Sequence, residues 1–266
     1  MKKNDKIFIA GHRGMVGSAL VRTLKEKGYT NLTLRSHLEL DLTVQEKVYT
    51  FFKEEHPDYV FLAAAQVGGI LANTTYRAEF IYSNLAIQNN VLDAAWKYNA
   101  KRLMFLGSSC IYPKHCPQPI KESYLLTGPL ETTNESYAIA KIAGLKTCEA
   151  YNYQYKTDYV TVMPTNLFGP NDNFEPETSH VMPALIQKIH QAKISKAKYV
   201  TIWGTGSPKR EFLHVDDMAS ACVFLMEKES FKDIINVGSG VDLTIRELAE
   251  MICKIIGFTG ELNFDT

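Results

Sequence analysis

A short apolar run near the start of the chain, residues 7–10, leads directly into three glycines spaced three residues apart. Residues 6–10 predict a buried strand, and residues 15–27 predict an amphipathic helix. Gly11, Gly14 and Gly17 lie at the junction, where glycines permit a tight turn and the helix N-terminus offers free N–H groups to a pyrophosphate. The spacing is a variant of Gly-x-Gly-x-x-Gly and by itself could mark an ordinary loop. Because it follows a strand, it predicts a dinucleotide-binding fold.

Strand-like and helical segments alternate through the first two-thirds of the sequence. Beyond the first strand and helix, strands are expected over residues 32–35, 59–64, 103–107 and 159–163, and helices over 44–55, 84–98 and 137–155. This alternation is typical of βαβ units that build a parallel sheet. After Pro164 the pattern changes, because prolines at 164, 170, 176 and 183 mark irregular structure. Shorter elements are expected over 181–192, 199–203 and 215–228, and a strand that returns to the main sheet over 234–237.

The sequence therefore predicts an α/β fold, a Rossmann-type doubly wound parallel sheet with a smaller, partly discontinuous C-terminal substrate domain. Residues 1–165 and about 212–240 are assigned to the dinucleotide-binding domain, and about 166–211 and 241–266 to the substrate-binding domain. The last residues, Glu-Leu-Asn-Phe-Asp-Thr, are typical of a strand that has just begun. We expect the chain to be truncated at its C-terminus relative to a complete enzyme.

Composition excludes several kinds of partner. Twenty-nine basic residues balance 29 acidic ones, which argues against nucleic acid and against an anionic membrane surface. No apolar run approaches the length that spans a membrane. The five cysteines are odd in number and form no Cys-x-x-Cys pair. They favour a reduced, cytoplasmic setting and argue against a structural zinc site, so no metal is expected.

Three side chains predict carbonyl chemistry. Tyr137 and Lys141 lie four residues apart, which places them on one face of a helix. An ammonium group beside a phenol favours the phenolate, so we expect Lys141 to lower the pKa of Tyr137. Such a phenol can exchange a proton with a carbonyl oxygen, and Ser108, at the end of a strand, can hold the same oxygen. Tyr-x-x-x-Lys also occurs by chance on solvated helices. The placement of all three residues favours a carbonyl reductase.

The end of the second strand indicates which dinucleotide binds. Selectivity for NAD usually requires a carboxylate there, but residues 34–37 read Leu-Arg-Ser-His and the first carboxylate is Glu39. Arg35, together with Arg13 in the glycine loop, suits a 2′-phosphate, so we predict NADPH over NADH. The alternative is that Arg35 is merely solvated and selectivity is loose. Asp41 and Leu42 are expected beside the adenine, and Ala63–Ala65 at the floor of the pocket.

Cys110 and His180 suggest a second proton-transfer pair. Buried cysteines and single histidines are usually structural. Cys110, however, lies two residues beyond Ser108, and His180 lies in the segment that should cover the substrate. A thiol and an imidazole on opposite sides of a keto sugar could remove and return protons beside the ketone, since Tyr137 and Ser108 would stabilise the enolate.

With these residues in place, the chain resembles the extended short-chain dehydrogenase/reductase family, and within it the GDP-L-fucose synthases. The resemblance covers essentially the whole sequence. It rests on Gly-His-Arg-Gly-Met-Val-Gly (11–17), Ala-Ala-Ala-Gln-Val-Gly-Gly-Ile (63–70), Leu-Gly-Ser-Ser-Cys-Ile-Tyr-Pro (106–113), Tyr-Ala-Ile-Ala-Lys (137–141), Met-Pro-Thr-Asn-Leu-Phe-Gly-Pro-Asn-Asp-Asn-Phe (163–174), Ser-His-Val-Met-Pro-Ala-Leu (179–185) and Arg-Glu-Phe-Leu-His-Val-Asp-Asp (210–217).

The resemblance implies an NADPH-dependent enzyme with two stages at one site. GDP-4-keto-6-deoxy-D-mannose is epimerised at C3 and C5, and its C4 ketone is then reduced to give GDP-L-fucose. Tyr137, Ser108 and Lys141 match the reductase residues, and Cys110 and His180 match the epimerisation base and acid. The positions that match cofactor contacts are Gly11, His12, Arg13, Gly14, Met15, Val16, Gly17, Arg35, His37, Asp41, Leu42, Leu106, Gly107, Ser109, Lys141, Pro164, Thr165, Asn166, Leu167 and His180.

The resemblance also extends to the substrate and to the assembly. Lys188, Trp203 and Arg210 match positions that hold the GDP-sugar. The family often has Arg at 188, and a lysine makes a weaker, monodentate phosphate contact. Members of the family are homodimers, which implies pairing through the helices expected over 84–98 and 137–155.

Two alternatives remain open. Another extended-family 4-reductase or 4-epimerase for nucleotide sugars would need neither Cys110 nor His180 as a proton-transfer pair. A dinucleotide-sensing regulator could keep the fold without catalysis, but such proteins typically lose the Tyr or the Lys, and Tyr137 and Lys141 are both present.

Overall fold

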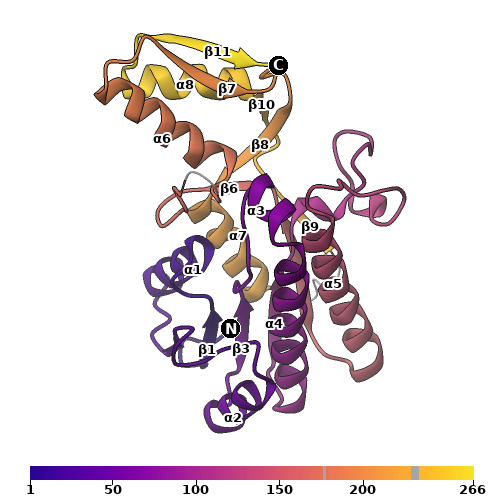
Figure 1. Ribbon diagram of the computed structural model, residues 1–266. Helices are drawn as coiled ribbons and strands as arrows, with labels where there is room; N and C mark the ends of the chain where they lie inside the picture. The colour runs from indigo at the N-terminus through magenta and orange to yellow at the C-terminus, as the bar shows by residue number, and fades with distance from the viewer. Residues whose placement is uncertain (176–177, 229–233) are drawn as a thin grey trace.

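The computed structural model describes residues 1–175, 178–228 and 234–266 (Figure 1). Its main sheet has six parallel strands in the order β2-β1-β3-β4-β5-β9. The strands are β1 (Ile7–Ala10), β2 (Leu32–Thr33), β3 (Tyr59–Leu62), β4 (Arg102–Leu106), β5 (Tyr159–Pro164) and β9 (Ile234–Val237). The chain runs from β1 to β2 on one side and then to β3 on the other, so the strand order reverses at β1. Open α/β sheets bind ligands at this point.

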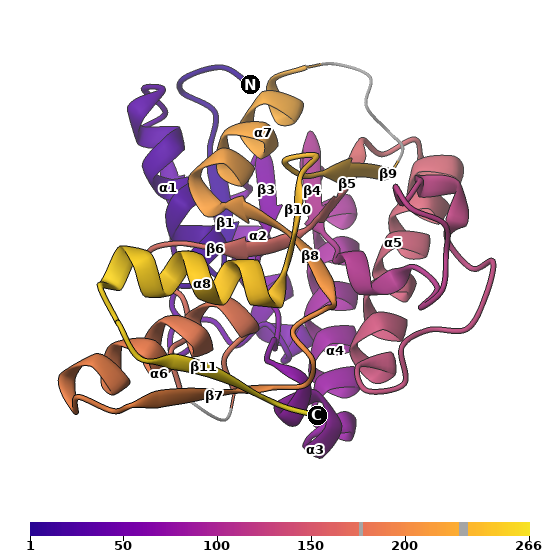
Figure 2. The ribbon, with the colours of Figure 1, turned by 90° about the horizontal axis from the view of Figure 1, so that it is seen from above.

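Helices cover both faces of the sheet. On one face lie α1 (Met15–Glu26) and α7 (Val215–Glu227), and on the other α2 (Gln45–Glu55), α4 (Arg77–Lys97) and α5 (Glu135–Tyr155). Figure 2 shows the two layers from above. The predicted fold class is confirmed.

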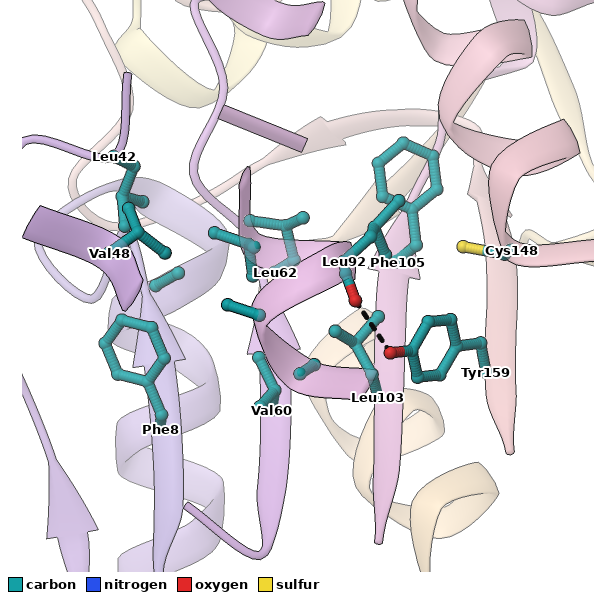
Figure 3. Close-up of a cluster of buried hydrophobic side chains, with 14 of the residues drawn as sticks. Phe8, Leu42, Val48, Val60, Leu62, Leu92, Leu103, Phe105, Cys148 and Tyr159 are labelled. Atoms are coloured by element: carbon teal, nitrogen blue, oxygen red, sulfur yellow. Dashed lines mark hydrogen bonds between the residues drawn. The ribbon is translucent and has the colours of Figure 1, made fainter. Parts of the chain in front are cut away.

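The strands are apolar on both faces because each face is covered. Ile7 and Ile9 pack towards α1 and α7, whereas Phe8 packs towards α2. Figure 3 shows the core between the sheet and the helices α2, α4 and α5. In this core the Tyr159 hydroxyl donates a hydrogen bond of 2.8 Å to the Leu92 carbonyl. A buried phenol thus joins β5 to α4 without leaving its polar atom unpaired.

A smaller lobe lies beyond the carboxyl ends of the strands (Figure 1). It contains α6 (Val181–Ile194), β7 (Tyr199–Trp203), α8 (Ile245–Ile256) and β11 (Glu261–Asp265). These share a third core of residues such as Ile189, Ile202 and Leu248. Between the lobes lies a three-stranded sheet in the order β10-β8-β6, formed by β6 (Asn166–Phe168), β8 (Lys209–His214) and β10 (Asp242–Thr244).

Several elements differ from the sequence-based predictions. The strand expected over residues 32–35 ends at Thr33, and Arg35 turns to Glu55 of α2 instead. The helix expected from residue 84 begins at Arg77 and follows a further short helix, α3 (Ile70–Thr75). β6, β8, β10 and α8 were not anticipated, although α8 begins with a capping box between Thr244 and Glu247. Pro176, expected in irregular structure, lies outside the described residues.

Candidate active site

The glycine loop packs against the end of β3. Gly11 has φ +85°, and a methyl group added there would lie 2.7 Å from the Ala64 backbone nitrogen. A methyl group at Gly17 would lie only 2.1 Å from the Gly11 carbonyl oxygen. The turn into α1 therefore requires glycine at both positions, and the N-terminus of α1 opens at the switch point of the sheet. These features fit a dinucleotide pyrophosphate.

The remaining predicted residues of the loop surround this turn. Arg13 is exposed, and Met15 and Val16 are half-buried in the first turn of α1. Burial lowers the pKa of His12 below its ordinary value, and the charge of Arg13 adds to this effect. A hydrogen bond to the Arg35 backbone opposes it.

The predicted adenine side of the site comprises Arg35, His37, Asp41 and Leu42. Arg35 pairs with the Glu55 carboxylate and donates to the Leu34 carbonyl, 3.0 Å away. His37 is exposed, with Nδ1 3.9 Å from Asp41 Oδ1. Arg35 is therefore an anchored cation, whereas Arg13 remains exposed to a ligand. Asp41 accepts hydrogen bonds from Thr43, which lower the pKa of its carboxyl, and Leu42 is buried.

Ser108 and Cys110 lie where β4 ends. Leu106 and Gly107 are buried, and residues Ser109–Ile111 form a single 3₁₀ turn. The Ser108 hydroxyl accepts from the Cys110 backbone N–H at 3.4 Å and caps this turn. The carboxyl end of a central strand therefore presents the hydroxyl and the thiol together.

Lys141 lies beneath this turn on α5. Lys141 is only 4% exposed, and its Nζ donates a hydrogen bond to the Leu106 carbonyl at 2.8 Å. The ammonium lies 5.7 Å from the centre of the Tyr137 ring and 4.9 Å from that of Phe105. Burial lowers the pKa of Lys141 to about 8, although the neighbouring Cys110 acts in the opposite direction.

The expected lowering of the Tyr137 pKa is wrong for this structure. Burial raises the pKa of the Tyr137 phenol well above its ordinary value, and the charge of Cys110 adds to this rise. A hydrogen bond to the Ser108 side chain lowers the pKa only in part. Since desolvation disfavours the phenolate more than the Ser108 hydrogen bond favours it, Tyr137 is a protonated phenol, suited to donating a proton.

The thiol of Cys110 shares this environment. Burial raises the pKa of Cys110 to about 11, while the Ser108 hydroxyl and the Lys141 ammonium lower it in part. Ser108 forms hydrogen bonds with both Cys110 and Tyr137, and the Lys141 ammonium lies close enough to influence the pKa of the thiol. The structure brings these four predicted residues together.

His180 lies on the other lobe, as the N-cap residue of α6. It is exposed, yet desolvation by the surrounding protein lowers the pKa of its imidazole, and the charge of Asp172 partly offsets this. No contact between His180 and the four residues above is seen in the described part of the chain.

Residues 164–167 carry the chain from β5 into β6. The Thr165 backbone N–H donates to Val237 at 3.2 Å, and the Asn166 amide donates to the Glu211 carbonyl at 3.1 Å. The buried Thr165 hydroxyl finds no hydrogen-bond partner among the described residues. A buried, unpartnered hydroxyl near the predicted cofactor site fits a ligand that completes its bonding. Pro164 ends β5, and Leu167 is half-buried in β6.

Two of the three predicted substrate residues lie together. Lys188 Nζ on α6 lies 5.7 Å from the centre of the Trp203 ring and donates to the Thr201 carbonyl at 2.6 Å. Trp203 is exposed at the end of β7. Arg210, on β8, is exposed and donates to the Lys209 carbonyl at 2.7 Å. The lysine and the indole can form a platform for a charged, planar group.

Sequence reasoning gave no role to several residues that hold this site. Gly69 contacts the segment before His180, Asn73 donates hydrogen bonds to the carbonyls of Gly68 and Gly69, and Phe80 packs against Tyr137. The sequence signal for Gly68 and Gly69 is the Ala-Ala-Ala-Gln-Val-Gly-Gly-Ile motif at residues 63–70, which contains both glycines.

Among the described residues, no group of three or more His, Cys, Asp or Glu side chains is placed to hold a metal ion. No helix in this part of the chain has the length and apolar character needed to cross a membrane.

Comparison with known proteins places the chain among nucleotide-sugar enzymes. Residues 7–238 match the NAD dependent epimerase/dehydratase family. The chain is 61% identical to GDP-L-fucose synthase 1 of Arabidopsis thaliana, over 99% of this chain and 81% of that protein. It is 54% identical to GDP-L-fucose synthase of Escherichia coli K12, over 98% of this chain and 84% of that protein.

A solved structure is similarly close. GDP-mannoheptose C4 reductase from Campylobacter jejuni, with NADP bound, is 45% identical. The two structures superpose with a TM-score of 0.93 over 100% of this chain and 88% of that one. The chain therefore belongs to the NAD dependent epimerase/dehydratase family and, within it, to the group of the GDP-L-fucose synthases.

Proposed function

We propose that this protein is an NADPH-dependent epimerase and reductase that converts GDP-4-keto-6-deoxy-D-mannose to GDP-L-fucose. The observation that carries the proposal is the cluster of Ser108, Cys110, Tyr137 and Lys141 at the end of β4, in a chain 50–61% identical to several GDP-L-fucose synthases. Tyr137 and Ser108 can bind a ketone oxygen. Cys110 lies beside them, although reduction of a ketone does not require a thiol.

In the first stage, Tyr137 and Ser108 donate hydrogen bonds to the C4 ketone oxygen. These bonds stabilise the enolate that forms when a proton leaves C3 or C5. Cys110, as thiolate, accepts the proton, and His180 delivers one to the opposite face of the same carbon. Burial disfavours both charged forms, but Lys141 and Ser108 favour the thiolate and Asp172 favours the imidazolium. Exchange with solvent restores the thiolate and the imidazolium before the second carbon reacts.

In the second stage, the Tyr137 phenol gives its proton to the C4 oxygen while Ser108 holds that oxygen in place. NADPH, when bound in the glycine loop, supplies the hydride. Lys141, whose ammonium lies 5.7 Å from the centre of the Tyr137 ring, stabilises the phenolate that remains. Exposed Arg13 and anchored Arg35 favour the 2′-phosphate of NADPH.

A second candidate is a GDP-4-keto-sugar reductase that does not epimerise its substrate. The likeness to the Campylobacter C4 reductase favours it. Only the epimerase needs Cys110 and His180 as a proton-transfer pair, so exchange of carbon-bound hydrogen separates the two candidates.

The test is to mix the protein with GDP-4-keto-6-deoxy-D-mannose and NADPH in D₂O. We expect NADPH to be consumed, and more efficiently than NADH in a parallel reaction. Deuterium should appear at C3 and C5 of the product, as detected by NMR. Cys110→Ser should slow deuterium incorporation by roughly 10²- to 10⁴-fold, as loss of a general base does. Cys116→Ser, which changes a cysteine outside the cluster, should keep the wild-type rate. Reduction without deuterium at either carbon would favour the simple reductase.

We further propose that the protein forms a homodimer through α4 and α5, which lie side by side on one face of the molecule (Figure 1). Both helices expose large aromatic side chains, with Tyr82 72% and Tyr153 83% exposed. Burying such residues in an interface is favourable.

Light scattering should therefore give a mass about twice the 30.0 kDa of one chain. Tyr82→Arg should shift the protein towards monomer, because it places a charge in the interface. Tyr199→Arg, at an exposed tyrosine of the smaller lobe, should not. A wild-type mass of one chain would refute the proposal.

The cysteines support a proposal of cytoplasmic location. All five are free in the structure, and thiols persist in a reducing compartment.

A further inference from the structure

The turn formed by residues 66–69 is held by two buried amides. The Asn84 side chain on α4 donates to the Gln66 carbonyl at 2.9 Å and accepts from the Gln66 backbone N–H at 3.0 Å. The Asn73 side chain on α3 donates to the carbonyls of Gly68, at 2.6 Å, and Gly69, at 3.0 Å. Both asparagines are buried, so these bonds are shielded from water and fix the turn.

The fixed 66–69 turn contacts the segment that ends in His180. The Gly69 backbone N–H donates to the Thr178 carbonyl at 2.8 Å. A methyl group added at Gly69 would lie 2.3 Å from the Ser179 carbonyl oxygen. The two backbones therefore touch immediately before His180, and only a residue without a side chain allows this approach. Gly69 has φ −68°, so its backbone conformation is open to any residue.

The same turn also faces the reductase side of the site. A methyl group at Gly68 would lie 3.2 Å from the Phe80 ring, and that ring meets the Tyr137 ring edge-on at 6.4 Å between centroids. The turn thus lies between Tyr137 in the larger lobe and the His180 segment in the smaller one. Of these two, Gly69 contacts only the His180 segment.

We propose that Gly69 and Asn73 are positioning residues for His180, needed for epimerisation but not for hydride transfer at C4. The inference rests on the proposed function. Asn73 fixes the turn, the turn sets the path of Thr178 and Ser179, and that path sets where the His180 imidazole meets the sugar. Ser108, Tyr137 and Lys141 are held by β4 and α5 and do not depend on this path.

Gly69→Ala tests the contact between Gly69 and Ser179. The substitution introduces little backbone strain, because alanine readily adopts the φ of −68° found at Gly69. The added methyl group must push the Ser179 carbonyl away, by more than an ångström if ordinary van der Waals contact is to be restored. A displacement of about that size lowers the rate of a positioned reaction by roughly 100-fold. We therefore expect the rate of deuterium exchange at C3 and C5 to fall by about 10- to 100-fold.

Hydride transfer is measured separately, in reverse, by oxidation of GDP-L-fucose with NADP⁺ by the same protein. This direction needs no epimerisation. For Gly69→Ala we expect the initial rate of NADPH formation and the KM for GDP-L-fucose to stay within about threefold of wild type, far from the 100-fold scale of a displaced catalytic group. A loss of both activities in equal proportion, or of neither, would overturn the inference.

Asn73→Ala gives a second reading without added bulk, because it removes both donors to the turn. It should lower exchange selectively, as Gly69→Ala does. Thr74→Ala is the matched control on the same helix, since Thr74 is exposed and bonds only the Ile70 carbonyl at 2.8 Å. If both test variants lose their fold, the turn is purely structural and the inference is wrong. If the wild-type protein itself neither exchanges nor oxidises, the proposed function fails instead.

Discussion

Tyr137→Phe should lower the rate of C4 ketone reduction by roughly 10²- to 10⁴-fold, the range seen when a general acid is removed. The ring of Phe fills the same half-buried space, so packing against Phe80 persists while the phenol hydroxyl is lost. In the proposed mechanism Ser108 still holds the ketone oxygen, and Cys110 and His180 are unchanged. Some deuterium exchange at C3 and C5 should therefore survive in the variant.

The measurement is single-turnover consumption of NADPH, with product analysis by NMR. The matched control is Tyr153→Phe, which removes an exposed phenol from the same helix and should leave reduction unchanged. If Tyr137→Phe reduces the ketone at the wild-type rate, the proton comes from another group and the assignment of Tyr137 is wrong.

Gly17→Ala should abolish useful NADPH binding. Its new methyl group would lie 2.1 Å from the Gly11 carbonyl oxygen and 2.6 Å from the carbonyl carbon, and neither atom can rotate away. The loop must separate from α1, which removes the N–H groups that face the pyrophosphate. We expect Kd for NADPH to rise at least 100-fold and stability to fall by about 1–3 kcal/mol, as overpacking of a close contact does.

Isothermal titration with NADPH and thermal unfolding of the free protein check this prediction. Gly14→Ala is the comparison within the same loop, because a methyl group there meets only the Gly11 carbonyl oxygen, at 3.5 Å. Its melting temperature should match that of wild type. Normal NADPH affinity in Gly17→Ala would show that the loop does not hold the cofactor.

Local patterns were sufficient to predict the sheet and its glycine loop. Residues 7–10 are all apolar and are followed at once by glycine, so neighbouring residues alone define the strand and the turn. Tyr137 and Lys141 share a helix, so their spacing predicts their proximity. The glycine loop and the Tyr137–Lys141 pair could therefore be predicted from residues that are close in sequence.

The pKa of Tyr137 could not be predicted in this way. Its direction depends on how deeply α5 is buried and on Cys110, 27 positions earlier in the sequence, and burial outweighs the charge that the spacing suggested. The strand β6 is similar, because it pairs with Leu213 and its neighbours rather than with adjacent residues. Contacts between distant segments decided both outcomes.

The 66–69 turn was missed for another reason. Its glycines were visible, but their purpose lies in Thr178 and Ser179, more than a hundred residues later. A pair of glycines after a strand is also typical of an ordinary loop. Only the close approach of two backbones distinguishes the two cases.

The chain passes between its two lobes several times, and each passage is short. β5 leads to β6 through Thr165 alone, β8 runs straight into α7, and β9 reaches β10 across residues 238–241. Lobes joined by a single linker can swing widely about it, but several short parallel tethers restrain such a hinge. Substrate entry is therefore expected to involve loop movement at the rim more than large-scale opening. Limited proteolysis at one site cannot release either lobe as an intact piece, since the smaller lobe is built from two separate stretches of chain.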